Sequence, residues 1–233
     1  MNKSFTTYQL NGSSVNLDDE IPTTMHTWKH EIKHLTGNAT HFVYVYSGRA
    51  VWNNPHTTYT FSLGAGMYCA LPSNGTLWGD GEGVIITARG YKGMFTFGGP
   101  IEPYGRLRYI DGCSDSLLIP PIIEGDPCLN ALYFPPHCEQ TPHTHPSFRA
   151  GVVVSGWGEC VTEEGCIALE PGLAFLIPKD EYHSFSTRDE ELIVIAYHPD
   201  SDYGPTDENH PMLNRTMIDG VSASKIERVK TRA

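Results

Sequence analysis

The histidines of the C-terminal half fall in two groups that are separated by β-type sequence. His143 and His145 stand two residues apart, and His183 returns later in the chain. Because side chains on a strand alternate between its two faces, His143 and His145 would point the same way. A third imidazole from a later strand can then complete a metal site. This arrangement requires strands that return to one another, and so predicts antiparallel β structure.

The residues between the two histidine groups have the composition of short strands and turns. Residues 150–154 are rich in β-branched side chains, and residues 159–162 and 166–169 flank a Glu-Glu-Gly turn as in a hairpin. Residues 173–177 form a short apolar run that ends at Pro178. The stretch is therefore predicted to be a series of antiparallel strands.

This stretch resembles the cupin superfamily of small β-barrels, which is recognised by two motifs. One motif is His-x-His followed by Glu and then Gly, and the other is Gly, Pro, Gly and His at fixed spacing. The residues that match are His143, His145, Gly156, Gly172, Pro178 and His183. Asp180 stands where the second glycine of the latter motif is usual. The sequence His-Thr-His-Pro at residues 143–146 is similar to the motif of the germin branch of the superfamily.

The resemblance implies a metal site with three histidine ligands in the C-terminal barrel. Cupins with a full ligand set bind the metal through three His and one Glu, but here the position of that Glu falls on Arg149. Glu139 or Gln140 could supply a replacement oxygen from the preceding turn. Imidazole suits several divalent transition metals, and the resemblance implies iron as the expected ion, with manganese, nickel or zinc as alternatives.

The resemblance also implies a reaction, because some cupin dioxygenases use three His and no carboxylate. The favoured function is metal-dependent dioxygenation of a small organic acid. Arg149 shares the strand parity of His145 if the strand is regular, and its guanidinium could then pair with a substrate carboxylate. The alternative for Arg149 is an outward, solvated side chain. Tyr182 is a second candidate catalytic residue, as a general acid or base.

Two other functional classes stay open. A non-redox cupin enzyme, such as a lyase, isomerase or amidohydrolase, would use the metal as a Lewis acid. A binding protein would hold a small molecule in the barrel without turnover. The identity of the metal distinguishes the enzymes.

The N-terminal half repeats the pattern of the C-terminal half. Residues 42–52 parallel the later strand and its Gly-Trp ending, and Gly66 precedes Pro72 by the same gap as Gly172 precedes Pro178. Internal repetition of this kind predicts an all-β chain with two double-stranded β-helix (jelly-roll) barrels, that is, a bicupin. We expect an N-terminal barrel in 1–112, a metal-binding barrel in 113–220 and a polar tail in 221–233.

The N-terminal barrel is expected to hold no metal. The positions equivalent to the three histidines carry Leu35, Gly37 and Leu77. A structural role is the first interpretation. The alternative is a metal-free ligand pocket among the aromatic residues Tyr44, Tyr46, Trp52 and Trp78.

A second histidine motif, His30-Glu31-Ile32-Lys33-His34, has the spacing of zinc proteases. That chemistry needs the pentapeptide on a helix, so that both histidines share one face. Too little chain precedes the motif to form the sheet on which such a helix packs. A strand or linker is therefore predicted, with a protease as the alternative.

Composition limits the partners and the location. The net charge of −11 argues against nucleic acid or an anionic membrane as partner. The start of the chain lacks the apolar core of a signal peptide, so a cytoplasmic protein is expected. The six cysteines contain no Cys-x-x-Cys and are predicted to be reduced thiols. We expect a homodimer that acts on a small molecule.

Overall fold

The computed structural model describes residues 4–18, 20–56, 58–200, 217–218 and 221–222. The described residues contain no α-helix, and their one helical segment is the single 3-10 turn η1 (Ile110–Gly112). All strand pairings in the described sheets are antiparallel. The Pro and Gly content of the chain favours this all-β architecture over helices, because both residues favour turns between short strands.

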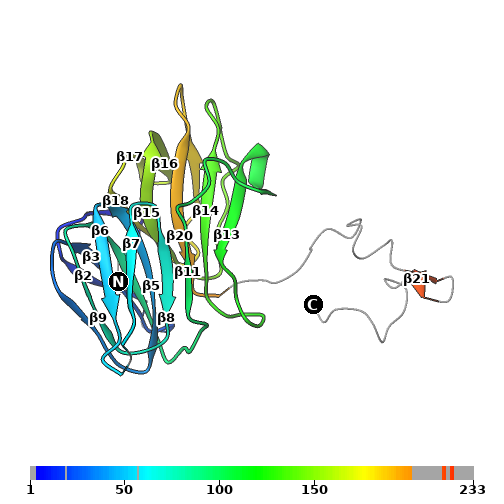
Figure 1. The fold of residues 1–233 in the computed structure, drawn as a ribbon. Coiled ribbons are helices and arrows are strands. Elements are labelled where there is room, and N and C mark those ends of the chain that lie inside the picture. Colours follow the sequence, from blue (N-terminus) through cyan, green and yellow to red (C-terminus); the bar gives the residue numbers. More distant parts are fainter. Residues whose placement is uncertain (1–3, 19, 57, 201–216, 219–220, 223–233) are drawn as a thin grey trace. The chain divides into compact units, whose positions relative to one another are not determined.

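The N-terminal half forms two sheets (Figure 1). The larger one has six strands, in the order β11 (Thr96–Gly98), β8 (Tyr68–Leu71), β5 (Ala39–Ser47), β10 (Glu82–Arg89), β3 (Thr23–Lys29) and β2 (Ser14–Asp18). The smaller one has four, in the order β4 (Lys33–Leu35), β9 (Gly75–Trp78), β6 (Arg49–Asn53) and β7 (Thr60–Gly64).

The C-terminal half forms a second pair of sheets. The larger one has seven strands, in the order β1 (Thr6–Gln9), β18 (Leu173–Ile177), β15 (Arg149–Gly156), β20 (Leu192–His198), β14 (Cys128–Phe134), β13 (Ser114–Ile119) and β12 (Leu107–Arg108). The smaller one has three, in the order β17 (Gly165–Leu169), β16 (Gly158–Thr162) and β19 (His183–Ser186).

The two large sheets repeat one strand order, since β8, β5, β10, β3 and β2 correspond in turn to β18, β15, β20, β14 and β13. The edge strand differs: β1, from the start of the chain, pairs with β18 in the C-terminal sheet. The predicted fold class, all-β with two double-stranded β-helix barrels, is confirmed. The predicted boundary at residue 112 falls at the end of η1.

Three clusters of buried hydrophobic side chains fill the spaces between the sheets. One lies inside the N-terminal barrel around Trp28 and Trp52, and a second lies inside the C-terminal barrel around Phe134 and Phe175. The third joins the opposite faces of the two large sheets, where Phe42 and residues of β20 belong to one cluster. Alternating side chains of each large sheet thus serve two different cores, as the twofold periodicity of strands requires.

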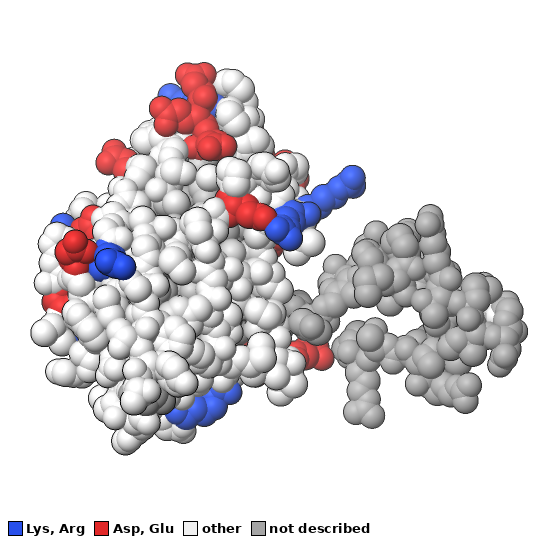
Figure 2. Space-filling model, viewed as in Figure 1, with Lys and Arg blue, Asp and Glu red and all other residues white. Residues whose placement is uncertain are grey.

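One face of the molecule carries few charged side chains (Figure 2). Acidic side chains gather in this view over the end where β16 and β17 lie, and basic ones are scattered (Figure 2). Among the described residues, no helix is long and apolar enough to span a membrane.

A separate unit, residues 202–233, contains the two-stranded hairpin β21 (Met217–Ile218) and β22 (Val221–Ser222). Most of the predicted polar tail, residues 223–233, lies outside the described residues.

Candidate metal centre

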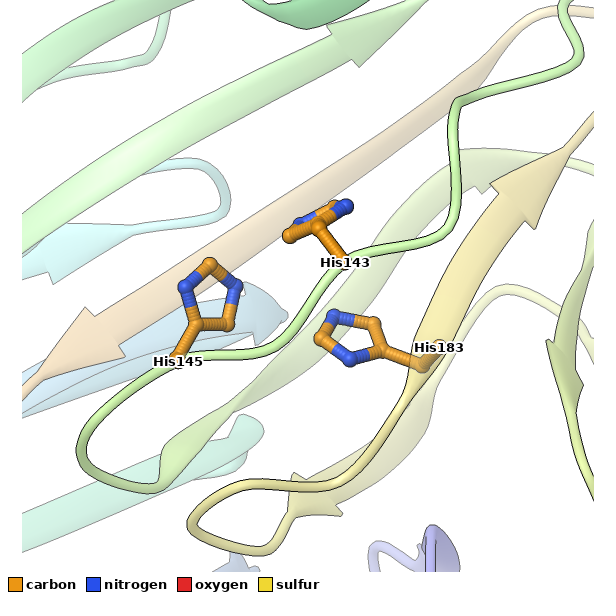
Figure 3. Close-up of side chains that lie close together, drawn as sticks. All are labelled: His143, His145 and His183. Carbon is orange, nitrogen blue, oxygen red and sulfur yellow. The ribbon is translucent and has the colours of Figure 1, made fainter.

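Three histidine rings converge at one end of the C-terminal barrel. His143 and His145 come from the loop that precedes β15, and His183 is the first residue of β19 (Figure 3). Their ring centroids are 4.8 to 5.2 Å apart, and one nitrogen from each ring lies within 4.8 Å of the others. This set of donors could hold a metal ion.

Backbone hydrogen bonds fix the two histidine segments side by side. The amide of His143 donates to the carbonyl of His183 at 2.9 Å, and the reverse bond measures 3.0 Å. The amide of Asp180 donates to the carbonyl of His145 at 2.9 Å. Asp180 has φ +60°, which explains why cupins favour glycine there and why Asp, which tolerates this region, can replace it. His145 lies in a loop and not on the expected strand, yet its ring still joins the cluster.

The hydrogen bonds of two rings select the tautomer that a metal needs. His143 Nδ1 lies 2.8 Å from the carbonyl of Thr141, and His183 Nδ1 lies 2.9 Å from the carbonyl of Glu181. A carbonyl only accepts, so each Nδ1 carries the proton and each Nε2 has a free lone pair. His183 Nε2 is buried and has no hydrogen-bond partner among the described residues. An orphaned buried nitrogen of this kind fits a metal ligand.

Burial keeps His145 and His183 uncharged near neutral pH. It is the main cause that lowers the pKa of His145 to about 3, and Arg149, His183 and His143 lower it further. Burial likewise lowers the pKa of His183 to about 4. A neutral imidazole coordinates without first losing a proton, so the two rings are ready to bind a cation.

Arg149 points into the barrel, beside the histidines. The residue is only 9% exposed, and the register shift in β15 lies beyond it, between Val153 and Ser155. Its Nη1 donates to Ser147 Oγ and the Phe148 carbonyl, at 2.5 and 2.9 Å, and lies 3.4 Å from Asp200 Oδ1. Its Nε is buried without a partner in the described residues. The inward orientation is thus observed and the solvated alternative is excluded, although residues 145–148 form no strand that would relate Arg149 to His145 by parity.

The other predicted site residues divide between the cavity and the surface. Gln140 is buried and lines the cavity, but its Oε1 accepts a hydrogen bond from the Phe185 amide at 3.3 Å. Glu139 is exposed on the surface. Tyr182 is 49% exposed and does not line the cavity. No carboxylate lines the cavity within the described part of the chain.

His198 lines the same cavity and was not predicted. It is the last residue of β20, and its inward-facing neighbours on that strand are Val194 and Ala196. Burial, followed by Arg149 and His145, lowers its pKa well below the usual value. The alternation of β20 could have identified it, because residue 198 has the parity of residues 194 and 196.

The cavity at the cluster is small, with a volume of about 20 Å³. Aromatic and aliphatic side chains such as Phe134, Phe175 and Val194 form much of its wall. A space of this size accommodates about one water-sized group. The histidines thus face an enclosed, largely apolar space with a guanidinium as its charged group.

The protease-type motif takes no part in this centre. Residues 30–32 form a turn after β3, and Lys33 and His34 belong to β4, so the two histidines do not lie on a helix. The predicted strand or linker is therefore observed.

No protein-family model matches the sequence, and no curated protein matches it. Solved structures do match in fold. A cupin 2 conserved barrel domain protein from Leptotrichia buccalis has a TM-score of 0.53 at 11% identity, over 84% of this chain and 89% of that one. A putative glyoxylate induced protein from Pseudomonas aeruginosa gives 0.59 at 12% identity, over 90% and 93%. A salicylate 1,2-dioxygenase from Pseudaminobacter salicylatoxidans gives 0.59 at 10% identity, over 76% and 70%. The chain therefore has the fold of the cupin barrels.

Proposed function

We propose that the protein is a metal-dependent dioxygenase of small organic acids, with His143, His145 and His183 as ligands. The observation that carries the proposal is the composition of the cavity: the three-histidine cluster, His198 and a buried guanidinium, with no carboxylate among the described lining residues. A bound iron would supply dioxygen activation. Arg149, whose Nη1 lies 3.4 Å from Asp200 Oδ1, is the charged side chain among the described lining residues, and its guanidinium favours an anionic substrate over a neutral one.

Arg149 is the proposed substrate-binding residue. Its Nε is buried without a partner in the described chain, and it lies beside the histidine cluster. A guanidinium binds a carboxylate through parallel N–H donors, and an unmet buried donor gains a partner when the acid enters. We also propose that Tyr182 acts as a general acid or base, because it directly precedes His183 and is half exposed.

The small enclosed volume limits the substrate. A cavity of about 20 Å³ holds about one water-sized group, so even a compact acid would have to displace side chains such as Phe134. The structural similarity to a salicylate 1,2-dioxygenase supports oxygenation of an acid in this fold. It does not identify the acid.

Elemental analysis of the purified protein beside His183→Ala tests the proposal. We expect about one iron per chain in the wild type and none in the variant, since one of three ligands is lost. His56→Ala, which removes an exposed histidine remote from the cluster, is the matched control and should retain the metal. Oxygen uptake with small acids should then depend on iron and fall in Arg149→Gln.

The outcomes separate the functional classes. Zinc or manganese as the bound metal, without oxygen uptake, would move the assignment to a non-redox cupin enzyme. The absence of any metal, even after reconstitution, would contradict both and leave a binding protein.

A further inference from the structure

The N-terminal barrel has a cavity of its own, much larger than the one at the histidine cluster. Its volume is about 360 Å³, within the range of small-molecule sites. Strands β3, β4, β5 and β10 contribute its walls. His41 on β5 has the parity of Val43 and Val45, which face the interior of this barrel, so the cavity is the mouth of the barrel.

In the N-terminal barrel, the residues equivalent to the histidine pair of the other barrel have no side-chain atom that can coordinate a metal. Leu35 pairs with Gly75 between β4 and β9, much as His143 pairs with His183 in the other barrel. Neither side chain can coordinate a metal. Any ligand of this cavity must therefore be held by other groups.

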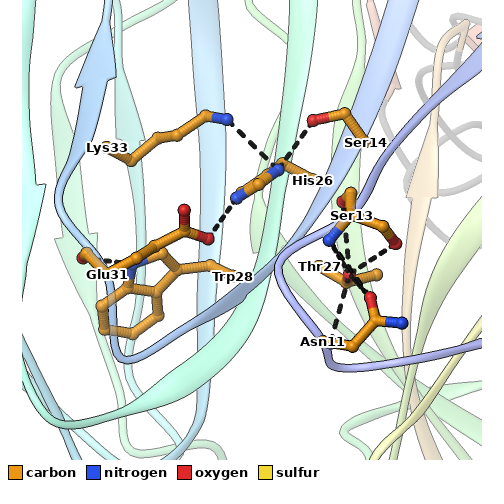
Figure 4. Close-up of polar contacts among 8 residues, drawn as sticks. All are labelled: Asn11, Ser13, Ser14, His26, Thr27, Trp28, Glu31 and Lys33. Atoms are coloured by element: carbon orange, nitrogen blue, oxygen red, sulfur yellow. Dashed lines mark hydrogen bonds and ion pairs between the residues drawn. The ribbon is translucent and has the colours of Figure 1, made fainter.

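Lys33 is held at the cavity by a hydrogen-bonded chain (Figure 4). His26 Nε2 lies 2.5 Å from Glu31 Oε1, and its Nδ1 lies 3.2 Å from Lys33 Nζ and 2.7 Å from Ser14 Oγ. An ammonium group only donates, so His26 Nδ1 accepts and the ring proton lies on Nε2, where Glu31 accepts it. Glu31, from the protease-type motif, thus orients a histidine that positions a lysine.

His41 offers an unmet polar atom to the same cavity. The residue is 2% exposed, and its Nδ1 lies 2.9 Å from Thr87 Oγ1. Its Nε2 is buried without a hydrogen-bond partner among the described residues. A buried polar atom without a partner costs free energy, which a bound ligand would recover.

The side chains that line the cavity include basic residues and no described acidic one. Lys33 and Arg89 line it, and neither forms an ion pair within the described part of the chain. No Asp or Glu belongs to the described lining. Leu35 and Ile85 add an apolar wall. Cationic groups next to an apolar wall favour an organic anion.

We propose that the mouth of the N-terminal barrel is a second binding site, which takes a small organic carboxylate without a metal. Lys33 and Arg89 bind the carboxylate, His41 hydrogen-bonds a polar group of the ligand, and the carbon skeleton packs on Leu35 and Ile85. This site is separate from the histidine cluster and does not depend on the proposed reaction there.

Calorimetric titration of the full chain, stripped of metal with a chelator, tests the site. The probes are succinate and benzoate, with succinamide as the uncharged counterpart of succinate. We expect at least one carboxylate to bind saturably and succinamide not to bind. Arg89→Gln and Lys33→Gln should each weaken binding about tenfold or more, since each removes one charged hydrogen bond.

Two control variants separate the sites. Arg49→Gln removes an exposed arginine of β6 outside the cavity and should bind as the wild type does. Arg149→Gln removes the proposed carboxylate partner of the other barrel, so carboxylate binding that persists in this variant belongs to the N-terminal mouth. The proposal is overturned if neither carboxylate binds, if Arg89→Gln and Lys33→Gln match Arg49→Gln, or if only Arg149→Gln abolishes binding.

Discussion

His41 should make the protein less stable in acid. Burial, with smaller contributions from Lys92 and Arg89, lowers its pKa from 6.5 to about 4. Below pH 6.5 the unfolded chain therefore takes up a proton that the folded chain refuses, so stability falls until pH 4 and this contribution is constant below it. At about 1.4 kcal/mol per pH unit, the loss approaches roughly 3 kcal/mol. The substitution His41→Gln removes the titrating ring and should remove this part of the loss.

Urea unfolding followed by tryptophan fluorescence at several pH values between 7 and 4 measures the effect. The quantity compared is the change in unfolding free energy with pH, because His41→Gln can also alter stability at pH 7. We expect the wild type to lose roughly 3 kcal/mol more than the variant over this range. Curves that run parallel within about 1 kcal/mol would refute the assignment of a neutral, buried His41.

The remaining predictions concern backbone geometry and thiols. Gly156 has φ +76°, and a Cβ there would lie 1.7 Å from the carbonyl oxygen of Glu191, so Gly156→Ala should cost more than about 3 kcal/mol in urea unfolding. Gly125→Ala, at φ +86° with open space, should cost only about 1 kcal/mol, and equal losses would contradict the clash. Five of the six cysteines are buried, and burial raises the pKa of Cys113 to about 12, so native protein should show one fast thiol towards a disulfide reagent. Cys166→Ser should abolish it, and fast reaction of a second thiol would show that a buried cysteine opens.

The repeat was predictable because glycines mark it. Gly48 directly follows β5 and Gly156 is the last residue of β15, both with positive φ, and Gly66 and Gly172 both adopt positive φ before the next strand. Such positions need glycine whatever the surrounding sequence, so their spacing reveals the architecture. The pairing of β1 with β18 was not predictable, because a polar edge strand carries no signal for its partner.

The histidine cluster was predictable from spacing, and its surroundings only in part. Arg149 faces inward as expected, but residues 145–148 form no strand, so parity with His145 does not explain this orientation. On β20, strand parity would have found His198. Parity could not show that Gln140 is bonded to the Phe185 amide, because that contact joins segments far apart in sequence. Strand parity also did not predict which residues line the cavity of the N-terminal barrel. The aromatic residues expected to form a ligand pocket there include Trp52, which is buried in the barrel core.

One position carries a neutral side chain in the N-terminal barrel and a cationic one in the C-terminal barrel. His41 precedes Gly48 by the same number of residues as Arg149 precedes Gly156, and both side chains face into the mouth of their barrel. In the C-terminal barrel this position carries a buried cation, and the donors that could hold a metal are the three histidines. In the N-terminal barrel the histidine lies deep and neutral, so the charge for an anion must come from Lys33 and Arg89. A chelator should therefore silence the first site and leave carboxylate binding at the second intact.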